Sequence, residues 1–472
     1  MSLKPYVHPR TWLAGGAAAV ALALVSLLVT GGNAGSVEKA AAAPAAAQAP
    51  DPNLYPFGAP TGNGDFKVPP PPGAPTLVPT IGTKTTQRLY GTTPFEEAVS
   101  ITQHIWPAAL KENTPAESYT PDRPWGLTLL TPDDPLTAIT ATPLIHFPDD
   151  APVLYVNKDG IPQVTLNEIK RLGPTGIARY NKVHVFLVGA AANSAVEKQL
   201  KAIGIKYVDV TAPSVPELAD KVDQLYGSIE NPDTGVANMS NGMENVMIGS
   251  MDGKDYQYLL PATHWVSHMA TGLLWTTKNS VPQATVNALK RRDGMARIYL
   301  FGGAQQISSA VAKQLAQYGT VIRITNDDQV AFNTSPTDNP IDTSIAFAKM
   351  WDPMGMVGWK ITGPGHGFTL VNINDWQGAV ASSPLSHLGF HAPLLFTDSA
   401  TQLPPAVDGY YRSVAPTFLT TPADGPYNMT YAIGSWSQIG WPVQTHVDYI
   451  SEMANRRLWA QTTGGRYGDS SQ

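Results

Sequence analysis

Cysteine is absent from this chain of 472 residues. Its absence excludes disulfides, thiolate zinc sites, iron–sulfur clusters and cysteine nucleophiles. Charged residues are also scarce, at 14% of the chain, and the formal net charge is −6. A nucleic-acid-binding protein needs a basic surface that neutralises phosphates, and the sequence has no basic stripe of that kind. We therefore expect no nucleic-acid partner, and a fold that core burial alone stabilises.

Motifs of catalysis and cofactor binding are missing as well. The sequence contains no Gly-x-Ser-x-Gly elbow, no Walker lysine loop and no complete Gly-rich dinucleotide fingerprint. Two histidine pairs, His264 with His268 and His387 with His391, have the spacing of one helix face, but a third zinc ligand is not evident for either pair. We interpret them as packing residues. The sequence thus predicts a non-enzymatic protein without a cofactor or a metal.

The N-terminal residues 1–34 are typical of an export signal. Lys4 and Arg10 precede an apolar run at 12–30, and small residues follow up to Ala34. A basic start, an apolar middle and a small-residue exit are the order of a secretory signal. The run is also about long enough to cross a hydrocarbon core of ~30 Å. Cleavage near Ala34 and an uncleaved anchor in the cytoplasmic membrane both remain open, and either one predicts an exported protein.

Residues 35–84 form a linker rich in proline and alanine. Eleven of the 42 prolines of the chain lie between Pro44 and Pro79. Such a segment buries too little apolar area to offset its ordering entropy, and its prolines favour an extended backbone. We therefore expect a disordered spacer between the membrane and the folded part.

Three stretches of the remaining chain repeat one pattern. Each starts with an apolar run that predicts a buried strand, and an Asp follows within a few residues. A second apolar run, a proline that opens a helix, and a third run that ends in glycine come next. In chain order, the first runs are 126–130, 245–248 and 368–371, and the aspartates that follow them are Asp134, Asp255 and Asp375. The second runs are 152–155, 272–275 and 393–396, and the prolines after them are Pro162, Pro282 and Pro404. The third runs are 183–188, 297–301 and 429–433.

This alternation predicts an α/β fold. Continuous apolar strands separated by helices are the pattern of a parallel sheet buried on both faces, and right-handed crossovers fix its topology. Each repeat is then a small Rossmann-like or flavodoxin-like module. We place module 1 at 85–227, module 2 at 228–352 and module 3 at 353–465, followed by a flexible tail at 466–472.

The same residues carry a resemblance to a known family. An Arg-x-x-Gly start at Arg88, an Asp after the first strand, then Pro-Leu, Pro-Leu-Leu, Leu-Pro and a strand ending in Gly-Gly resemble the putative cell wall-binding repeat 2 family. The resemblance covers roughly 84–453, although Gly-Gly is complete only at Gly302 and Gly303. It implies three modules around a pseudo-threefold axis and non-covalent attachment to anionic polymers of the cell wall.

The candidate binding residues lie at strand exits and module joints, and each has a plain structural alternative. The strand-exit aspartates could bind sugar hydroxyls, or cap the helices that follow. The glycine pair could accept a phosphate, or let a strand and a helix pack closely. Trp376 could stack on a sugar, or lie in the core. The predicted polymer-binding residues are Arg88, Asp134, Asp255, Arg323, Asp375, Gly302, Gly303 and Trp376.

The sequence therefore predicts an exported protein of the cell wall or cell surface that binds a wall polymer, either a glycan or an anionic polymer. Repeated modules would act through avidity, so individually weak contacts suffice. Two other functions remain open. The chain could be a subunit of a surface layer or another assembly, or a degenerate α/β hydrolase.

Overall fold

The computed structural model describes residues 82–108, 122–233, 243–324, 339–388, 390–416 and 426–452. The expected signal at 1–34, the tail at 466–472 and all but the last residues of the linker lie outside these ranges. Within the described ranges, no helix is both long and apolar enough to cross a membrane.

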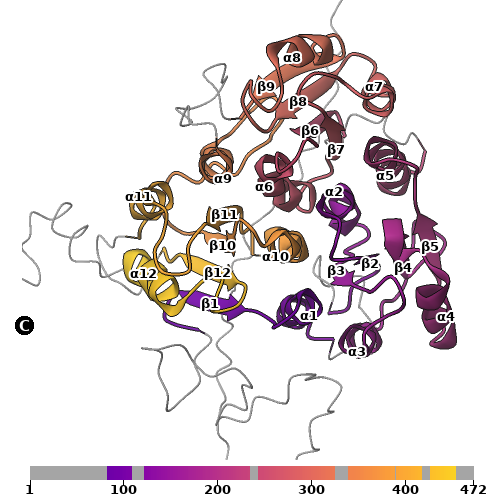
Figure 1. Cartoon of the computed structure of the whole chain (residues 1–472), viewed down its shortest axis with the longest axis horizontal. Coiled ribbons are helices and arrows are strands. Elements are labelled where there is room, and N and C mark those ends of the chain that lie inside the picture. The colour runs from indigo at the N-terminus through magenta and orange to yellow at the C-terminus, as the bar shows by residue number, and fades with distance from the viewer. Residues whose placement is uncertain are drawn as a thin grey trace, which may run out of the picture. The chain divides into compact units, whose positions relative to one another are not determined.

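The strands form three sheets of four parallel strands each (Figure 1). In every sheet the first strand of a module lies between the second and the third, the order of a flavodoxin-like unit. The first sheet contains β2 (Leu127–Leu130), β3 (Val153–Tyr155), β4 (Val185–Val188) and β5 (Tyr207–Val210), the second β6 (Asn245–Ser250), β7 (Gly272–Thr276), β8 (Ala296–Leu300) and β9 (Gly319–Arg323), and the third β10 (Gly367–Asn372), β11 (Leu394–Thr397), β12 (Met429–Ile433) and β1 (Thr86–Leu89).

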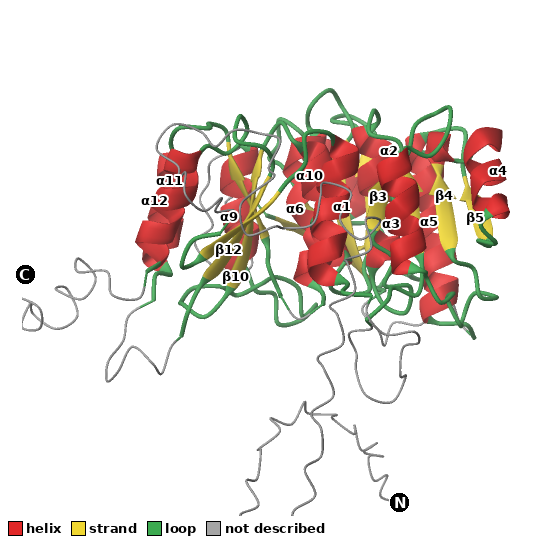
Figure 2. Ribbon diagram, turned by 90° about the horizontal axis from the view of Figure 1, so that it is seen from below, coloured by secondary structure: helices red, strands yellow, loops and turns green. Residues whose placement is uncertain are grey.

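Helices follow the strands in the same order in each module and run alongside them (Figure 2). Module 1 contains α2 (Pro135–Thr140), η1 (Thr142–Ile145), α3 (Gln163–Leu172), η2 (Gly189–Ala191) and α4 (Ser194–Ala202), module 2 α6 (Tyr256–Val266), α7 (Gln283–Lys290) and α8 (Ser309–Leu315), and module 3 α10 (Trp376–Ala381), η5 (Ser383–Ser386), α11 (Pro405–Ser413) and α12 (Trp441–Ser451). Three further helices connect the modules: α1 (Pro94–Ile105), α5 (Val215–Glu230) and α9 (Pro340–Lys349).

Equivalent helices of the modules meet around a pseudo-threefold axis. The helices that follow the first strands, α2, α6 and α10, contact one another pairwise. They lie together between the three sheets in Figure 1. The expected α/β class, the parallel sheets and the threefold arrangement are therefore confirmed.

The first strand of the described chain completes the last sheet. β1 pairs in parallel with β12, with Thr86 opposite Thr430 and Leu89 opposite Ile433. The sequence predicts that module 1 begins at residue 85, but β1 belongs to the sheet of module 3. α1 then leads from β1 to module 1, where it contacts α3 and β3. β1 therefore brings the first described residues of the chain next to the last strand of module 3.

The prolines expected to open helices lie one residue earlier than the first helical turn. Pro162, Pro282 and Pro404 are N-cap residues with ψ between 139° and 149°, which is outside the helical region. A helix end is defined only to within one or two residues, and each of these helices begins directly after its proline. In two of them an equivalent threonine bonds back to the second strand: Thr165 donates to the Tyr155 carbonyl and Thr285 to the Trp275 carbonyl.

Candidate polymer-binding site

The three strand-exit aspartates lie at the amino ends of α2, α6 and α10. Asp134 accepts hydrogen bonds from the backbone N–H groups of Leu136 (3.1 Å) and Thr137 (3.2 Å). Asp375 accepts from the Gly378 N–H at 3.0 Å. Asp134 and Asp375 therefore cap the helices that follow them, which accounts for both residues without a sugar ligand. Asp255 makes no side-chain cap and instead accepts from the Ser250 hydroxyl at 2.9 Å.

Glutamines two residues after these aspartates join one module to the next. Gln257 donates to the Ile373 carbonyl and Gln377 to the Pro132 carbonyl, each over 3.0 Å. Both acceptors stand two residues before an aspartate of the neighbouring module. The third equivalent position is Leu136, whose side chain has no donor. These bonds bring the segments after the first strands of neighbouring modules together.

Trp376 packs in the interior at this junction. Only 8% of the residue is exposed, and its ring meets that of Tyr155 edge-on with centroids 6.3 Å apart. The Tyr155 hydroxyl donates to the Gln377 carbonyl at 2.8 Å. This placement argues against stacking of Trp376 on a sugar and gives it a role in the contact between modules 1 and 3.

Sequence reasoning missed a second acidic group beside Asp375. Glu97 of α1 is buried, and a Cβ added at Gly378 would lie 3.0 Å from Glu97 Oε1 and 2.6 Å from Asp375 Oδ2, so the two carboxyl groups are neighbours. Burial, together with the neighbouring charge of Asp375, raises the pKa of Glu97 well above its usual range. Burial also raises the pKa of Asp375 to about 6, against the opposing effect of its hydrogen bonds. Since both groups lie in a helix interface at 5% and 4% exposure, they are not open to a ligand.

The two predicted arginines anchor loops inside their modules. Arg88, 1% exposed, donates to the Gly434 carbonyl (2.8 Å) and the Ile439 carbonyl (2.7 Å). Arg323, 5% exposed, donates in the same way to the carbonyls of Gly302 (2.8 Å) and Ile307 (2.9 Å). The guanidinium of Arg88 also stacks 3.8 Å from the Trp436 ring. This placement argues against direct contact of either arginine with a polymer.

Gly302 and Gly303 form the turn after β8. Gly302 has a φ of +112°, and the equivalent Gly434 and Gly189 have φ values of +115° and +61°. The Gly303 carbonyl accepts the Ile307 N–H at 2.9 Å. The positive φ at these positions is enough to explain why a glycine follows the third strand of each module, and no ligand has to be invoked.

We expect Gly302→Ala to lower the free energy of unfolding by about 2–3 kcal/mol, because its φ is strained for alanine and the added Cβ would lie 2.9 Å from the Gln306 Cβ. Gly294→Ala is the matched control in the same module. Its φ is +76°, and the Cβ would meet no atom within 4 Å, so a loss of roughly 1 kcal/mol is expected. Urea unfolding measures both. Equal losses would show that Gln306 moves aside at no cost.

The histidines at the opposite end of the central helices pack together. His146, His268 and His387, one from each module, lie with ring centroids 5.0 Å (His146 to His387) and 6.3 Å (His268 to His387) apart. Burial lowers the pKa of His268 to about 3. His264 is buried and contacts the Ala392 carbonyl (2.9 Å) and the Ser386 hydroxyl (2.7 Å). No group of three or more metal-ligating side chains among the described residues has the geometry to hold an ion.

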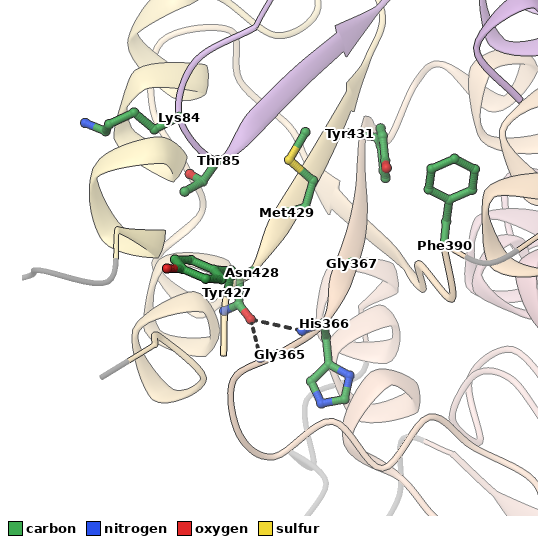
Figure 3. A pocket seen from close by; sticks show the side chains of 10 residues that line it. All are labelled: Lys84, Thr85, Gly365, His366, Gly367, Phe390, Tyr427, Asn428, Met429 and Tyr431. Carbon is green, nitrogen blue, oxygen red and sulfur yellow. Dashed lines mark hydrogen bonds between the residues drawn. The ribbon is translucent and has the colours of Figure 1, made fainter. Parts of the chain in front are cut away.

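A cavity of about 400 Å³ at the amino end of the third sheet was also not anticipated (Figure 3). Its walls include Phe390, Tyr427 and Tyr431, with His366 at its edge. No sequence motif marks it, because these residues come from separate loops and a strand. The sequence offered only an excess of aromatic residues in this module.

Comparisons with known proteins show the fold. Neither a family model nor a curated protein matches the sequence. Among solved structures, Cwp6 from Clostridium difficile is similar with a TM-score of 0.58 and 17% identity, over 79% of this chain and 48% of that chain. Cwp8 from the same organism is similar with a TM-score of 0.55 and 14% identity, over 78% of this chain and 52% of that chain. This chain therefore spans about half the length of each.

Proposed function

We propose that this chain is a non-catalytic protein of the cell surface that attaches to a cell-wall polymer through its three α/β modules. The observation that carries the proposal is the shared three-module fold: the similar structures, Cwp6 and Cwp8, are cell wall proteins. The resemblance of the repeats to a wall-binding family, noted from the sequence alone, supports the same conclusion. The export signal expected at 1–34 fits this location.

The buried titratable groups support a non-catalytic role. Strongly shifted pKa values often mark active sites, but they do so where the groups face a cleft. Glu97 and Asp375 have raised pKa values and lie between helices at about 5% exposure. His264 is fully buried and bonds to carbonyls and hydroxyls of its own chain. These groups serve the packing of the modules.

The proposal is tested by sedimentation of the purified full chain with cell walls from which proteins have been stripped. We expect the chain to be retained by the walls and released by an excess of solubilised wall polymer. An unrelated folded protein of similar net charge serves as the control for non-specific adsorption. Retention no greater than that of the control would refute the proposal, and concentration-dependent self-association without retention would favour an assembly subunit instead.

A further inference from the structure

The cavity at the amino end of the third sheet has a rigid frame. The buried Asn428 side chain accepts hydrogen bonds from the N–H groups of Gly365 (2.7 Å) and His366 (3.1 Å), and it donates to the Val414 carbonyl at 2.8 Å. The Met429 N–H then bonds to the His366 carbonyl at 3.0 Å. Figure 3 shows the first two of these bonds at the base of the cavity. The loop that carries His366 is therefore held in place before any ligand arrives.

Aromatic rings form two sides of the cavity. Phe390 and Tyr431 meet at 89° with centroids 5.2 Å apart, and the His104 ring braces both at 5.4 and 5.2 Å. Tyr427 lies on the other side in Figure 3 and is 57% exposed, one of the most exposed large hydrophobic side chains of the described structure. A volume of about 400 Å³ lies within the usual range of small-ligand sites.

The equivalent place is filled in the other two modules. Tyr299, which corresponds to Tyr431 in module 2, is covered by the loop that follows α9: its hydroxyl bonds to Asp352 at 2.8 Å. In module 1 the corresponding Phe186 stacks against Tyr180 with centroids 6.0 Å apart. At this place, beside the third strand of the sheet, module 3 therefore departs from its two relatives.

Two polar side chains that line the cavity are neutral, and the charge of its lysine is paired. Burial raises the pKa of the Tyr431 phenol to about 12 and lowers the pKa of the His366 imidazole, so both are uncharged at neutral pH. The Lys84 ammonium at the rim pairs with Asp448 (3.3 Å) and Glu452 (3.4 Å). Phosphate or carboxylate groups thus find no unbalanced positive charge here, whereas a phenol and an imidazole can bond to hydroxyl groups.

We propose that this cavity binds one neutral pyranose ring of a cell-wall glycan, an assignment that rests on the proposed wall attachment. The ring's apolar C–H face would pack on Tyr427 or on the Phe390 side, and its hydroxyl groups would meet Tyr431 and His366. An aromatic ring offers a rigid apolar face at low entropic cost, which suits such a ligand. The other two modules then contribute to attachment through different contacts.

The test is a calorimetric titration of the full chain with two probes: peptidoglycan glycan strands freed of stem peptides, and neutral polysaccharide released from the wall. Tyr427→Ala should weaken binding of one probe by about tenfold, because it removes one stacking surface. Tyr449→Ala is the matched control: Tyr449 is 58% exposed, on α12, and the variant should bind like the unaltered chain. Tyr431→Phe removes a single hydroxyl and should weaken binding by a smaller factor.

The outcomes separate this inference from the proposed function. If the unaltered chain is retained by walls while Tyr427→Ala and Tyr449→Ala bind both glycan probes equally well, the cavity assignment is refuted and wall attachment stands. Binding of free stem peptides, but not of glycan, in a manner that depends on Tyr427 would also overturn it. Failure of the unaltered chain to bind walls at all would refute the proposed function itself.

Discussion

Asp223→Ala should destabilise the protein by about 3–5 kcal/mol, because it leaves a buried arginine without its counter-ion. Asp223 of α5 and Arg292, just after α7, are both 0% exposed at the side chain, and Arg292 Nη2 lies 2.7 Å from Asp223 Oδ1. A second bond, from Arg292 Nη1 to Asp223 Oδ2, measures 3.1 Å. The pair holds the helix that leaves module 1 against module 2.

The surroundings of Arg292 show that the pair is built into the interface. Its remaining donors meet the carbonyls of Met243 (2.8 Å) and Ala288 (2.9 Å), so each side of the guanidinium is engaged. At Gly272 an added Cβ would lie 2.6 Å from Arg292 Nη2 and 2.7 Å from Asp223 Oδ1. Glycine at the start of β7 therefore makes room for the pair. Removing the acid leaves the buried guanidinium without its compensating charge.

Asp220→Ala is the matched control on the same helix. Asp220 pairs with Arg291, whose side chain is 26% exposed, and a partly exposed pair contributes about 1 kcal/mol or less. Urea unfolding should give a large loss for Asp223→Ala and a small one for Asp220→Ala. The pKa of Asp223 is lowered, since Arg292 and Arg291 outweigh the opposing effect of burial. Its contribution should thus be present above the unfolded-state pKa and disappear as the pH falls through the folded-state pKa. Equal, small losses for both variants would contradict this account.

Most of the secondary structure could be predicted from the sequence. The expected strand at 368–371 is observed as Gly367–Asn372, and the one at 393–396 as Leu394–Thr397. These strands are buried on both faces, and continuous apolar runs bounded by glycine and proline therefore mark them clearly. The fourth strand of each sheet was harder to recognise. β5, for example, lies at a sheet edge, and its residues before Val210 are only partly buried or exposed.

The partners of the polar residues could not be predicted. Arg88 looks like a surface residue in the sequence, and its acceptors Gly434 and Ile439 lie about 350 positions away. Secondary-structure propensity and motif spacing report only local preferences. The parallel pairing of β1 with β12 instead depends on contacts between residues far apart in the sequence. The structure therefore shows mostly internal contacts for Arg88, Arg323 and Trp376, and their binding of a polymer stays a prediction.

Replacing Glu97 with glutamine should make the protein more stable at neutral pH. The unaltered protein must either bury two charged carboxylates side by side or take up a proton when it folds, and both cost free energy. The Glu97 and Asp375 carboxyl groups lie side by side and buried, and we expect them to share a proton because two neighbouring buried carboxylates repel each other. A glutamine side chain has the same shape and supplies a permanent donor for the Asp375 carboxylate. The Gly378 N–H already donates to one oxygen of that carboxylate, and the glutamine amide would add a second donor.

The pH dependence gives the sharper test. Because the folded-state pKa of Asp375 is raised to about 6, the folded protein binds more protons than the unfolded chain at mildly acid pH. The pair's contribution is therefore fully present below the unfolded-state pKa of the carboxyls and is lost as the pH rises through about 6. We expect a loss on the order of 2–3 kcal/mol for the unaltered chain and a smaller one for Glu97→Gln, because position 97 no longer titrates and the glutamine amide can donate to the Asp375 carboxylate.

The contribution of the pair can be isolated by subtracting the two unfolding curves. The buried histidines act in the opposite direction, since the lowered pKa values of His146 and His268 make the fold less stable as the pH falls. Both proteins contain them, so their effect cancels in the difference. The free energy of unfolding of Glu97→Gln minus that of the unaltered chain should rise between about pH 4 and pH 7. A difference that stays flat across this range would show that the two carboxyl groups do not share a proton, and that the contact between α1 and α10 is held by packing alone.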